Sequence, residues 1–258
     1  MPAVKPASTP PLKYVGGIDM AKSSFVACLG RLDLSQQLSF SKEVTFDNTL
    51  SGFTALLIWV GKKQSTAAPL LFVVKGTGVY YEELAYSLAD NRQSLSVLLP
   101  NKAKHFARST ELKSKTDQLD ARLLCRLGLE RSLPAWQPPT AALRQLRAQA
   151  RKRQVLTRQG AQPKTRVYAY RHSHRPGSRT LARLVTQQGL IVQQLSALDQ
   201  NLAELLTAEP ELARKLTQLT SIPGIGLTTA IVVVAETSGF VLVENERQLA
   251  SYAGLDVV

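Results

Sequence analysis

The first half of the chain alternates short apolar runs with polar turns and with helically spaced apolar positions. Phe72, Val73 and Val74 form a run typical of a strand buried on both faces, and glycines follow it. From Val79 to Ala89 the apolar residues recur at helical spacing. Runs such as "KYVGGIDMAKSSFVACLGRL", "QLSFSKEVTF" and "SLSVLLP" predict further strands, and "TLSGFTALLIWVGKK" predicts a helix. A hairpin meander followed by strand–helix–strand steps predicts an α/β domain with a mixed sheet over residues 13–132.

The next stretch, residues 133–215, has the pattern of long helices. Pro138 and Pro139 precede Thr140, which is a suitable N-cap for the first of them. The stretch "GAQPKTRVYAYRHSHRPGSR" contains two glycines and two prolines, so we expect a break or an exposed loop there. Beyond it, residues 181–205 carry an apolar seam with alternating steps of three and four. Its positions are Leu181, Leu184, Gln188, Ile191, Leu195, Leu198, Leu202 and Leu205. The seam suits either packing within its own domain or a coiled coil with another subunit.

The two ends of the chain have their own character. Residues 1–12 are rich in proline and polar residues, and we expect a disordered leader. Region 216–258 starts with "LTSIPGIGLTTA" and stops at Val258 without a capping or tail pattern. This pattern predicts a C-terminal domain that is truncated.

Positive charge is concentrated in the middle of the chain. The net charge is +13, and residues 101–183 hold 20 of the 32 Lys and Arg residues with only four acids. That segment carries +16 and the remainder carries −3. Such a block favours a polyanionic partner, above all nucleic acid. A solvated basic face and an anionic membrane surface are the alternatives.

Cysteine content and the lengths of the apolar runs indicate the cellular compartment in which we expect the protein. The two cysteines, Cys28 and Cys125, are too few and too far apart in sequence for a disulfide framework or a cysteine-based metal cluster. No apolar run is long enough for a membrane span, and the N-terminus lacks the apolar core of a signal peptide. We therefore expect a cytoplasmic protein without a membrane partner.

Three acids are candidates for metal-ion chemistry. Asp19 comes at the end of an apolar strand, and Asp117 and Asp120 lie three residues apart after Thr116, a possible N-cap. Acids in a first helical turn often serve only to complement the helix dipole. Together with Asp19, however, the pair offers the oxygen ligands that Mg²⁺ prefers, and two such ions catalyse phosphoryl transfer.

These residues, in this order, resemble a known family. The segments "GIDMAKSS", "GTGVYYEELAYSL", "KTDQLDARLL" and "IPGIGLTTA…RQLASYAGL" resemble the Piv/MooV-type insertion-sequence transposases. The resemblance covers residues 15–130 and 215–256. It implies an RNase H-like, RuvC-like domain with a DEDD tetrad, Mg²⁺, DNA strand exchange and a bacterial, nucleoid-associated setting. A structured RNA encoded by the element is an implied partner. Separately, the apolar seam predicts a homo-oligomer assembled through residues 181–205.

Two features depart from that family pattern. Asp19, Asp117 and Asp120 match the first, third and fourth acids, whereas Lys75 stands where the second acid, a glutamate, is expected. A protonated lysine cannot ligate Mg²⁺, and its charge can displace a cation from the neighbouring acids. The family's nucleophilic serine comes after "YAGL", and neither Ser238 nor Ser251 matches it. We therefore expect no nucleophile in this chain.

Several residues are predicted to contact nucleic acid. "SIPGIGLTTA" suits a helix-hairpin-helix-like phosphate contact through Gly224, Gly226 and Thr228, although an ordinary glycine turn is the alternative. Tyr168, Tyr170 and the neighbouring histidines alternate with arginines, which suits stacking on unpaired bases. The predicted phosphate contacts are Lys102, Lys104, Arg108, Lys113, Lys115, Arg144, Arg147, Arg151, Lys152 and Arg153.

Three functions are compatible with these patterns. The first is a DNA transposase or recombinase that exchanges strands by Mg²⁺-dependent phosphoryl transfer. The second is a catalytically dead relative that binds nucleic acid, as a remnant or a regulator. The third is an actin-like or sugar-kinase ATPase, because "GIDMAKSS" resembles the first phosphate loop of that class; the glycine usual after the aspartate is absent here.

Overall fold

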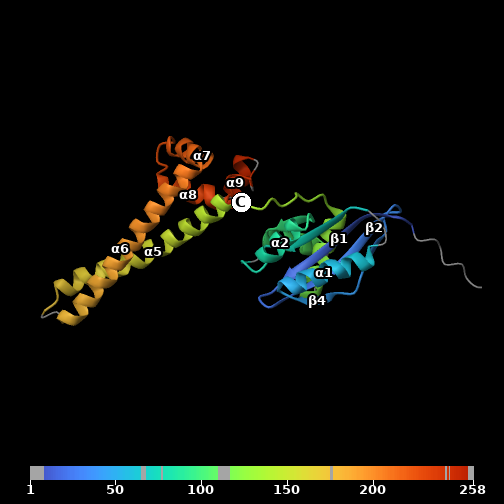
Figure 1. Cartoon of the computed structure of the whole chain (residues 1–258), viewed down its shortest axis with the longest axis horizontal. Helices are drawn as coiled ribbons and strands as arrows, with labels where there is room; N and C mark the ends of the chain where they lie inside the picture. Colours follow the sequence, from blue (N-terminus) through green and yellow to red (C-terminus); the bar gives the residue numbers. More distant parts are fainter. Residues whose placement is uncertain are drawn as a thin grey trace, which may run out of the picture. The chain divides into compact units, whose positions relative to one another are not determined.

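The protein is described by a computed structural model that divides into two compact units, Met1–Pro138 and Pro139–Val258. The described residues are 9–64, 68–76, 78–109, 117–174, 177–241, 243 and 245–254, without the side chains of residues 117–119. Figure 1 shows the strands confined to the first unit and the long helices α5 and α6 in the second.

The first unit is built on a mixed sheet. Its strands are β1 (Pro11–Met20), β2 (Ser24–Asp33), β3 (Leu38–Phe40), β4 (Val44–Asp47), β5 (Leu70–Lys75) and β6 (Ser94–Leu98). Their order is β3-β2-β1-β5-β6, with β4 also paired to β2. β1, β2, β3 and β4 pair antiparallel, whereas β5 and β6 add in parallel beside β1. The α/β fold with a mixed sheet predicted from the sequence is confirmed.

Helices cover both faces of this sheet. α1 (Leu50–Lys63) and α2 (Glu82–Asp90) pack on one face, and α3 (Pro100–Ser109) and α4 (Asp117–Glu130) pack on the other. On β5, Phe72 and Val74 join the core under α1 and α2, while Val73 joins the core under α4. The apolar run therefore has no polar alternation because both of its faces are buried.

Two element boundaries differ from the sequence expectation. β1 begins at Pro11, inside the stretch that we expected to be leader; a proline is tolerated as the first residue of a strand. α2 begins at Glu82 rather than Val79, because Gly78, with φ of +62°, and Val79 to Tyr81 form turns after β5.

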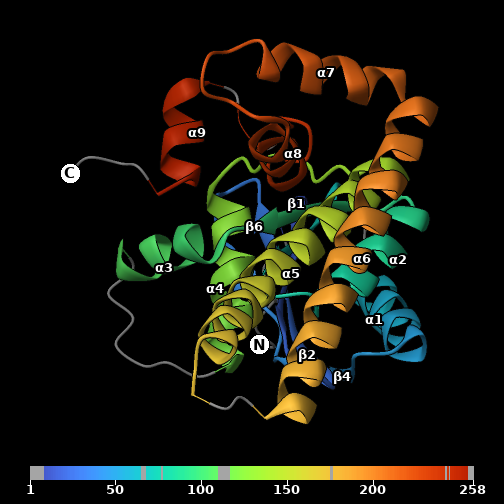
Figure 2. The ribbon, with the colours of Figure 1, turned by 90° about the vertical axis from the view of Figure 1, so that its left-hand side faces the viewer.

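The second unit is helical. α5 (Ala141–Arg171) and α6 (Ser178–Ala208) lie side by side as an antiparallel hairpin (Figure 1). α7 (Pro210–Thr220) turns away from the end of α6, α8 (Leu227–Glu236) folds back to pack on α5, and α9 (Glu246–Tyr252) follows (Figure 2). Leu146, Leu202, Leu216 and Val234 bring one residue each from α5, α6, α7 and α8 into a common core.

The predicted cap of α5 is present, but the predicted break inside it is not. The Thr140 hydroxyl accepts a hydrogen bond from the Leu143 amide at 3.2 Å. α5 then runs without interruption through Gly160 and Pro163 and ends only at Arg171. Pro163 is buried, and a side chain at Gly160 would meet Ile191 of α6 at 3.2 Å. Close packing on α6 thus overrides the local tendency of these residues to end a helix.

The apolar seam of residues 181–205 packs against another helix of the same chain. Its positions are buried or half-buried, Ile191, Leu202 and Leu205 most fully, and α6 packs on α5. The structure therefore supports the first of the two alternatives, packing within the seam's own unit.

Candidate active site

The candidate site lies where two parallel strands end on one face of the sheet. Along β1, Val15, Gly17 and Asp19 alternate onto the face covered by α4, and along β5 Val73 and Lys75 do the same. Because β1 and β5 are neighbours and parallel, Asp19 and Lys75 reach the same edge of the sheet. Carboxyl ends of strands are where α/β proteins commonly place their functional groups.

α4 brings a second carboxylate to this edge. A side chain at Gly17 would overlap the backbone of Ala121 and Cys125, and one at Gly128 would meet Val15 at 2.7 Å. Glycines at these contacts let α4 lie directly on the sheet. Asp120, next to Ala121, is thereby placed over the end of β5.

Lys75 joins the two carboxylates. Its Nζ lies 2.8 Å from Oδ1 of Asp19 and 2.9 Å from Oδ2 of Asp120. The exposed fractions of the three side chains are 22% for Lys75, 10% for Asp19 and 30% for Asp120. Burial lowers the pKa of Lys75, but the hydrogen bonds and charges of Asp19 and Asp120 outweigh it and raise that pKa above the ordinary value of lysine. The ammonium form is therefore held firmly between the two acids.

The remaining predicted acid is only partly described. Asp117 is the first residue of α4, and its side chain lies outside the described residues, as does its predicted cap Thr116. Glu82 and Glu83 begin α2, whose buried residues pack on the opposite face of the sheet. They are therefore not placed to supply the carboxylate that the family resemblance implies at position 75.

The described donors do not fit a resident Mg²⁺ ion. Mg²⁺ requires close to six oxygen ligands in octahedral geometry, and an ammonium offers no lone pair. Among the residues that the structure describes, no group of three or more His, Cys, Asp or Glu side chains could hold a metal. Asp19 and Asp120 already share the cation of Lys75, so a metal ion would have to displace it against charge repulsion.

Two residues predicted to contact nucleic acid also make contacts within the second unit. Arg147 donates to the Ala235 carbonyl at 3.0 Å and also to the Ser238 hydroxyl, which is buried. Arg151 forms two hydrogen bonds of 2.8 Å with the Glu236 carboxylate. Local sequence does not reveal these contacts, because the partners lie more than 80 residues away along the chain.

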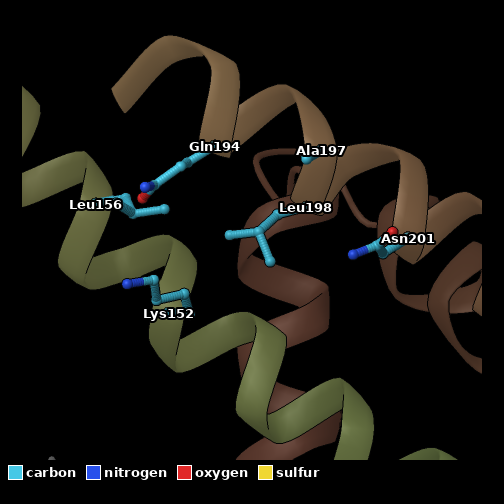
Figure 3. A pocket seen from close by; sticks show the side chains of 6 residues that line it. All are labelled: Lys152, Leu156, Gln194, Ala197, Leu198 and Asn201. Carbon is cyan, nitrogen blue, oxygen red and sulfur yellow. The ribbon is translucent and has the colours of Figure 1, made fainter. Parts of the chain in front are cut away.

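The other basic residues of α5 differ in their surroundings. Arg153 pairs with Asp199 of α6 at 3.1 Å, and Arg144 donates to the Pro139 carbonyl at 3.0 Å. Lys152 lines a groove of about 230 Å³ between α5 and α6, together with Leu156, Gln194, Ala197, Leu198 and Asn201 (Figure 3). Apart from Lys152 these side chains are neutral, so the groove has no cluster of groups for chemistry.

Two further predicted surfaces are exposed. On α3, Lys102, Lys104 and Arg108 point to solvent while Ala103 and Phe106 pack inward. Lys113 and Lys115 lie outside the described residues. Gly224 has φ of +88° in the turn before α8, and Gly226 is the N-cap of α8 without a side-chain cap. Thr228 is exposed in the first turn of α8, so this backbone is open to a ligand.

Comparisons with known proteins identify the class. A family model described as a transposase matches residues 16–176, and the model of the transposase IS116/IS110/IS902 family matches residues 216–258. The chain belongs to this family of transposases.

Individual relatives are also known. Pilin gene-inverting proteins of Moraxella lacunata and Moraxella bovis are each 31% identical over 249 residues, 93% of this chain and 70% of theirs. A solved structure, T. thermophilus RuvC in complex with Holliday junction substrate, aligns with 48% of this chain and 99% of its own. That alignment has a TM-score of 0.33 and 10% identity. No helix among the described residues is both long and apolar enough for a membrane span.

Proposed function

We propose that this chain is a DNA-binding member of the transposase family whose acidic site is closed by its own lysine. The observation that carries the proposal is the pair of contacts from Lys75 to Asp19 and Asp120, at 2.8 and 2.9 Å. Family membership and the basic segment 101–183 support DNA as the partner. The family's relatives named for inverting a pilin gene suggest that the DNA substrate is a recombination site.

The alternative is an active recombinase that exchanges strands by metal-dependent phosphoryl transfer. Asp19 and Asp120 favour it, because two carboxylates within reach of one cation are the start of a metal site. Lys75 opposes it, because its ammonium occupies the space between those carboxylates. We expect Mg²⁺ to bind weakly at this site in the natural chain. We also expect the natural chain not to cleave DNA strands when Mg²⁺ is present.

A structured RNA partner is a further expectation from the family resemblance, and self-association is a further expectation from the apolar seam. The basic segment suits RNA as well as DNA. Self-association through residues 181–205 would have to use the remaining surface of α6, because the seam faces α5.

The first experiment compares the natural chain with Lys75→Glu and with Lys62→Glu, an exposed change on α1 that has the same charge difference. Metal binding is measured by calorimetry with Mg²⁺ and Mn²⁺, and DNA cleavage is measured on supercoiled plasmid. We expect Lys75→Glu to bind metal more than about tenfold tighter than the other two, which corresponds to ~1.4 kcal/mol.

The natural chain should bind duplex DNA, measured by fluorescence anisotropy, and its affinity should fall as the salt concentration rises. Metal-dependent cleavage or strand exchange by the natural chain would overturn the closed-site proposal. Failure to bind either duplex or single-stranded DNA at low salt would overturn the proposed partner.

A further inference from the structure

The far half of α5 presents an exposed stripe of aromatic and cationic side chains. Lys164, Tyr168, Arg171 and His172 are spaced by four, three and one residues, which places them on one face of the helix. All four are exposed, and Tyr168 is 68% exposed, the highest value among the aromatic residues described. Pro163 and Val167, four residues apart on the neighbouring face of this half, are buried.

The aromatic part of this stripe is ordered by local contacts. The ring centroids of Tyr168 and His172 are 4.4 Å apart, with planes inclined by 36°. Nδ1 of His172 lies 2.8 Å from the Tyr168 carbonyl oxygen, which fixes the imidazole at the helix end. A ring held in place loses little conformational freedom when a flat ligand stacks on it.

The charge around the stripe is uniformly positive. Residues 131–198 contain thirteen Lys and Arg residues and no Asp or Glu. The first acid beyond, Asp199, is already paired with Arg153. Among the described residues, no ion pair involves a side chain of 158–183, in contrast to Arg151 and Arg153 nearer the start of α5. The cations at this end of the hairpin are therefore available to an external anion.

We infer that this stripe binds an unpaired strand of DNA, with a base stacked on Tyr168 and phosphates bound by Lys164 and Arg171. The inference rests on the proposed DNA-binding function and names the form of DNA. A duplex buries the faces of its bases, so an exposed tyrosine ring contributes little to binding it. In a single strand the base faces are open, and lysine and arginine on either side of Tyr168 along the stripe match the phosphates that flank a base.

The test uses the full chain and fluorescently labelled oligothymidine, a DNA hairpin duplex of equal phosphate number, and oligouridine. The variants are Tyr168→Ala, Tyr168→Phe and Lys164→Ala combined with Arg171→Ala. Val155→Ala is the matched control, because Val155 is exposed on the same helix but about 140° around it from Tyr168.

We expect Tyr168→Ala to weaken oligothymidine binding by about tenfold and to leave duplex binding unchanged. Tyr168→Phe should restore binding to within about twofold, because the ring is retained. The double variant should lower the salt slope for oligothymidine by roughly 1.4, the value for two phosphates on a single strand. Val155→Ala should leave both ligands unaffected.

The outcomes separate this inference from the function on which it rests. If duplex DNA binds but Tyr168→Ala does not change oligothymidine binding, or weakens both ligands equally, the stripe is not a single-strand site. Tighter binding of oligouridine than of oligothymidine would overturn the assignment to DNA. If neither DNA form binds, the DNA-binding function fails as well.

Discussion

Asp19 and Lys75 lie at the carboxyl ends of neighbouring parallel strands with their side chains on the same face of the sheet, and their charged groups are 2.8 Å apart. The lysine stands at the position where the family resemblance implies a glutamate. The same strand geometry that would gather carboxylates around a metal thus gathers a carboxylate and an ammonium. Compared with the tetrad that the resemblance implies, one charge has the opposite sign.

Replacing Lys75 with methionine should destabilise the first unit. The change leaves Asp19 and Asp120 facing each other without a counter-ion, which is costly for partly buried charges. We expect a loss of about 1–3 kcal/mol in the free energy of unfolding, measured with urea. Lys62→Met is the control and should change stability by less than about 0.5 kcal/mol. An equal effect of the two substitutions would show that the ion pairs contribute nothing.

The stabilisation by Lys75 should persist across neutral pH and disappear at high pH. Its pKa is raised in the folded state, so the contribution is fully present below the ordinary lysine value and is lost as pH rises through the folded value. The difference in unfolding free energy between the natural chain and Lys75→Met should therefore be constant near neutrality and shrink in strong alkali. A difference that grows with rising pH would contradict the assigned contacts.

Gly17→Ala should displace α4. The new methyl group would overlap the backbone of Ala121 and Cys125, which cannot rotate away as a side chain can. We expect a loss of about 3 kcal/mol in stability, the upper range for overpacking. Gly61→Ala provides the contrast, because Gly61 lies in α1 with open space around it and should gain about 0.4–1 kcal/mol. Unchanged stability in Gly17→Ala would show that α4 does not lie directly on β1.

The pair Arg151–Glu236 should stabilise the second unit more than an ordinary surface pair. A double-mutant cycle with Arg151→Ala and Glu236→Ala should give a coupling of about 1 kcal/mol, because the contact is bidentate and joins two helices. The exposed pair Arg214–Glu211, three residues apart on α7, should give about 0.3 kcal/mol. Similar coupling energies for the two pairs would show that the Arg151–Glu236 pair stabilises the protein no more than an ordinary surface pair.

The same pair predicts a pH dependence in acid. The hydrogen bond from Arg151 lowers the pKa of Glu236, which burial opposes and the charges of Arg151 and Arg147 reinforce. A lowered pKa in the folded state gives stability that is present above the ordinary glutamate value and is lost as pH falls through the folded value. Glu236→Gln should therefore flatten the acid limb of the stability profile, measured by thermal unfolding. An unchanged acid limb would count against this pairing.

Local patterns predicted the parts of the protein that depend on near neighbours. The run Phe72 to Val74 indicated a strand buried on both faces, and the cap at Thr140 followed from its own sequence. The convergence of Asp19 and Lys75 could be expected from the positions of two strand ends and from the family resemblance, which implies a glutamate at position 75.

Contacts between distant segments could not be predicted in the same way. Arg147 and Arg151 looked like free cations because their partners on α8 and just after it are remote in sequence. Gly160 and Pro163 looked like helix breakers because their close packing against α6 is a tertiary feature. In each case the local sequence does not show the distant residues that make the contact.

The unbroken course of α5 through Gly160 and Pro163 has a mechanical consequence. Arg151, fastened to Glu236, and Tyr168, exposed near the other end, are about 25 Å apart on one hydrogen-bonded rod. A hinge at Gly160 would have let the far end swivel independently of α8. Because α5 has no such hinge, a displacement of the helix at Tyr168 also moves Arg151 and, through the Glu236 contact, acts on α8.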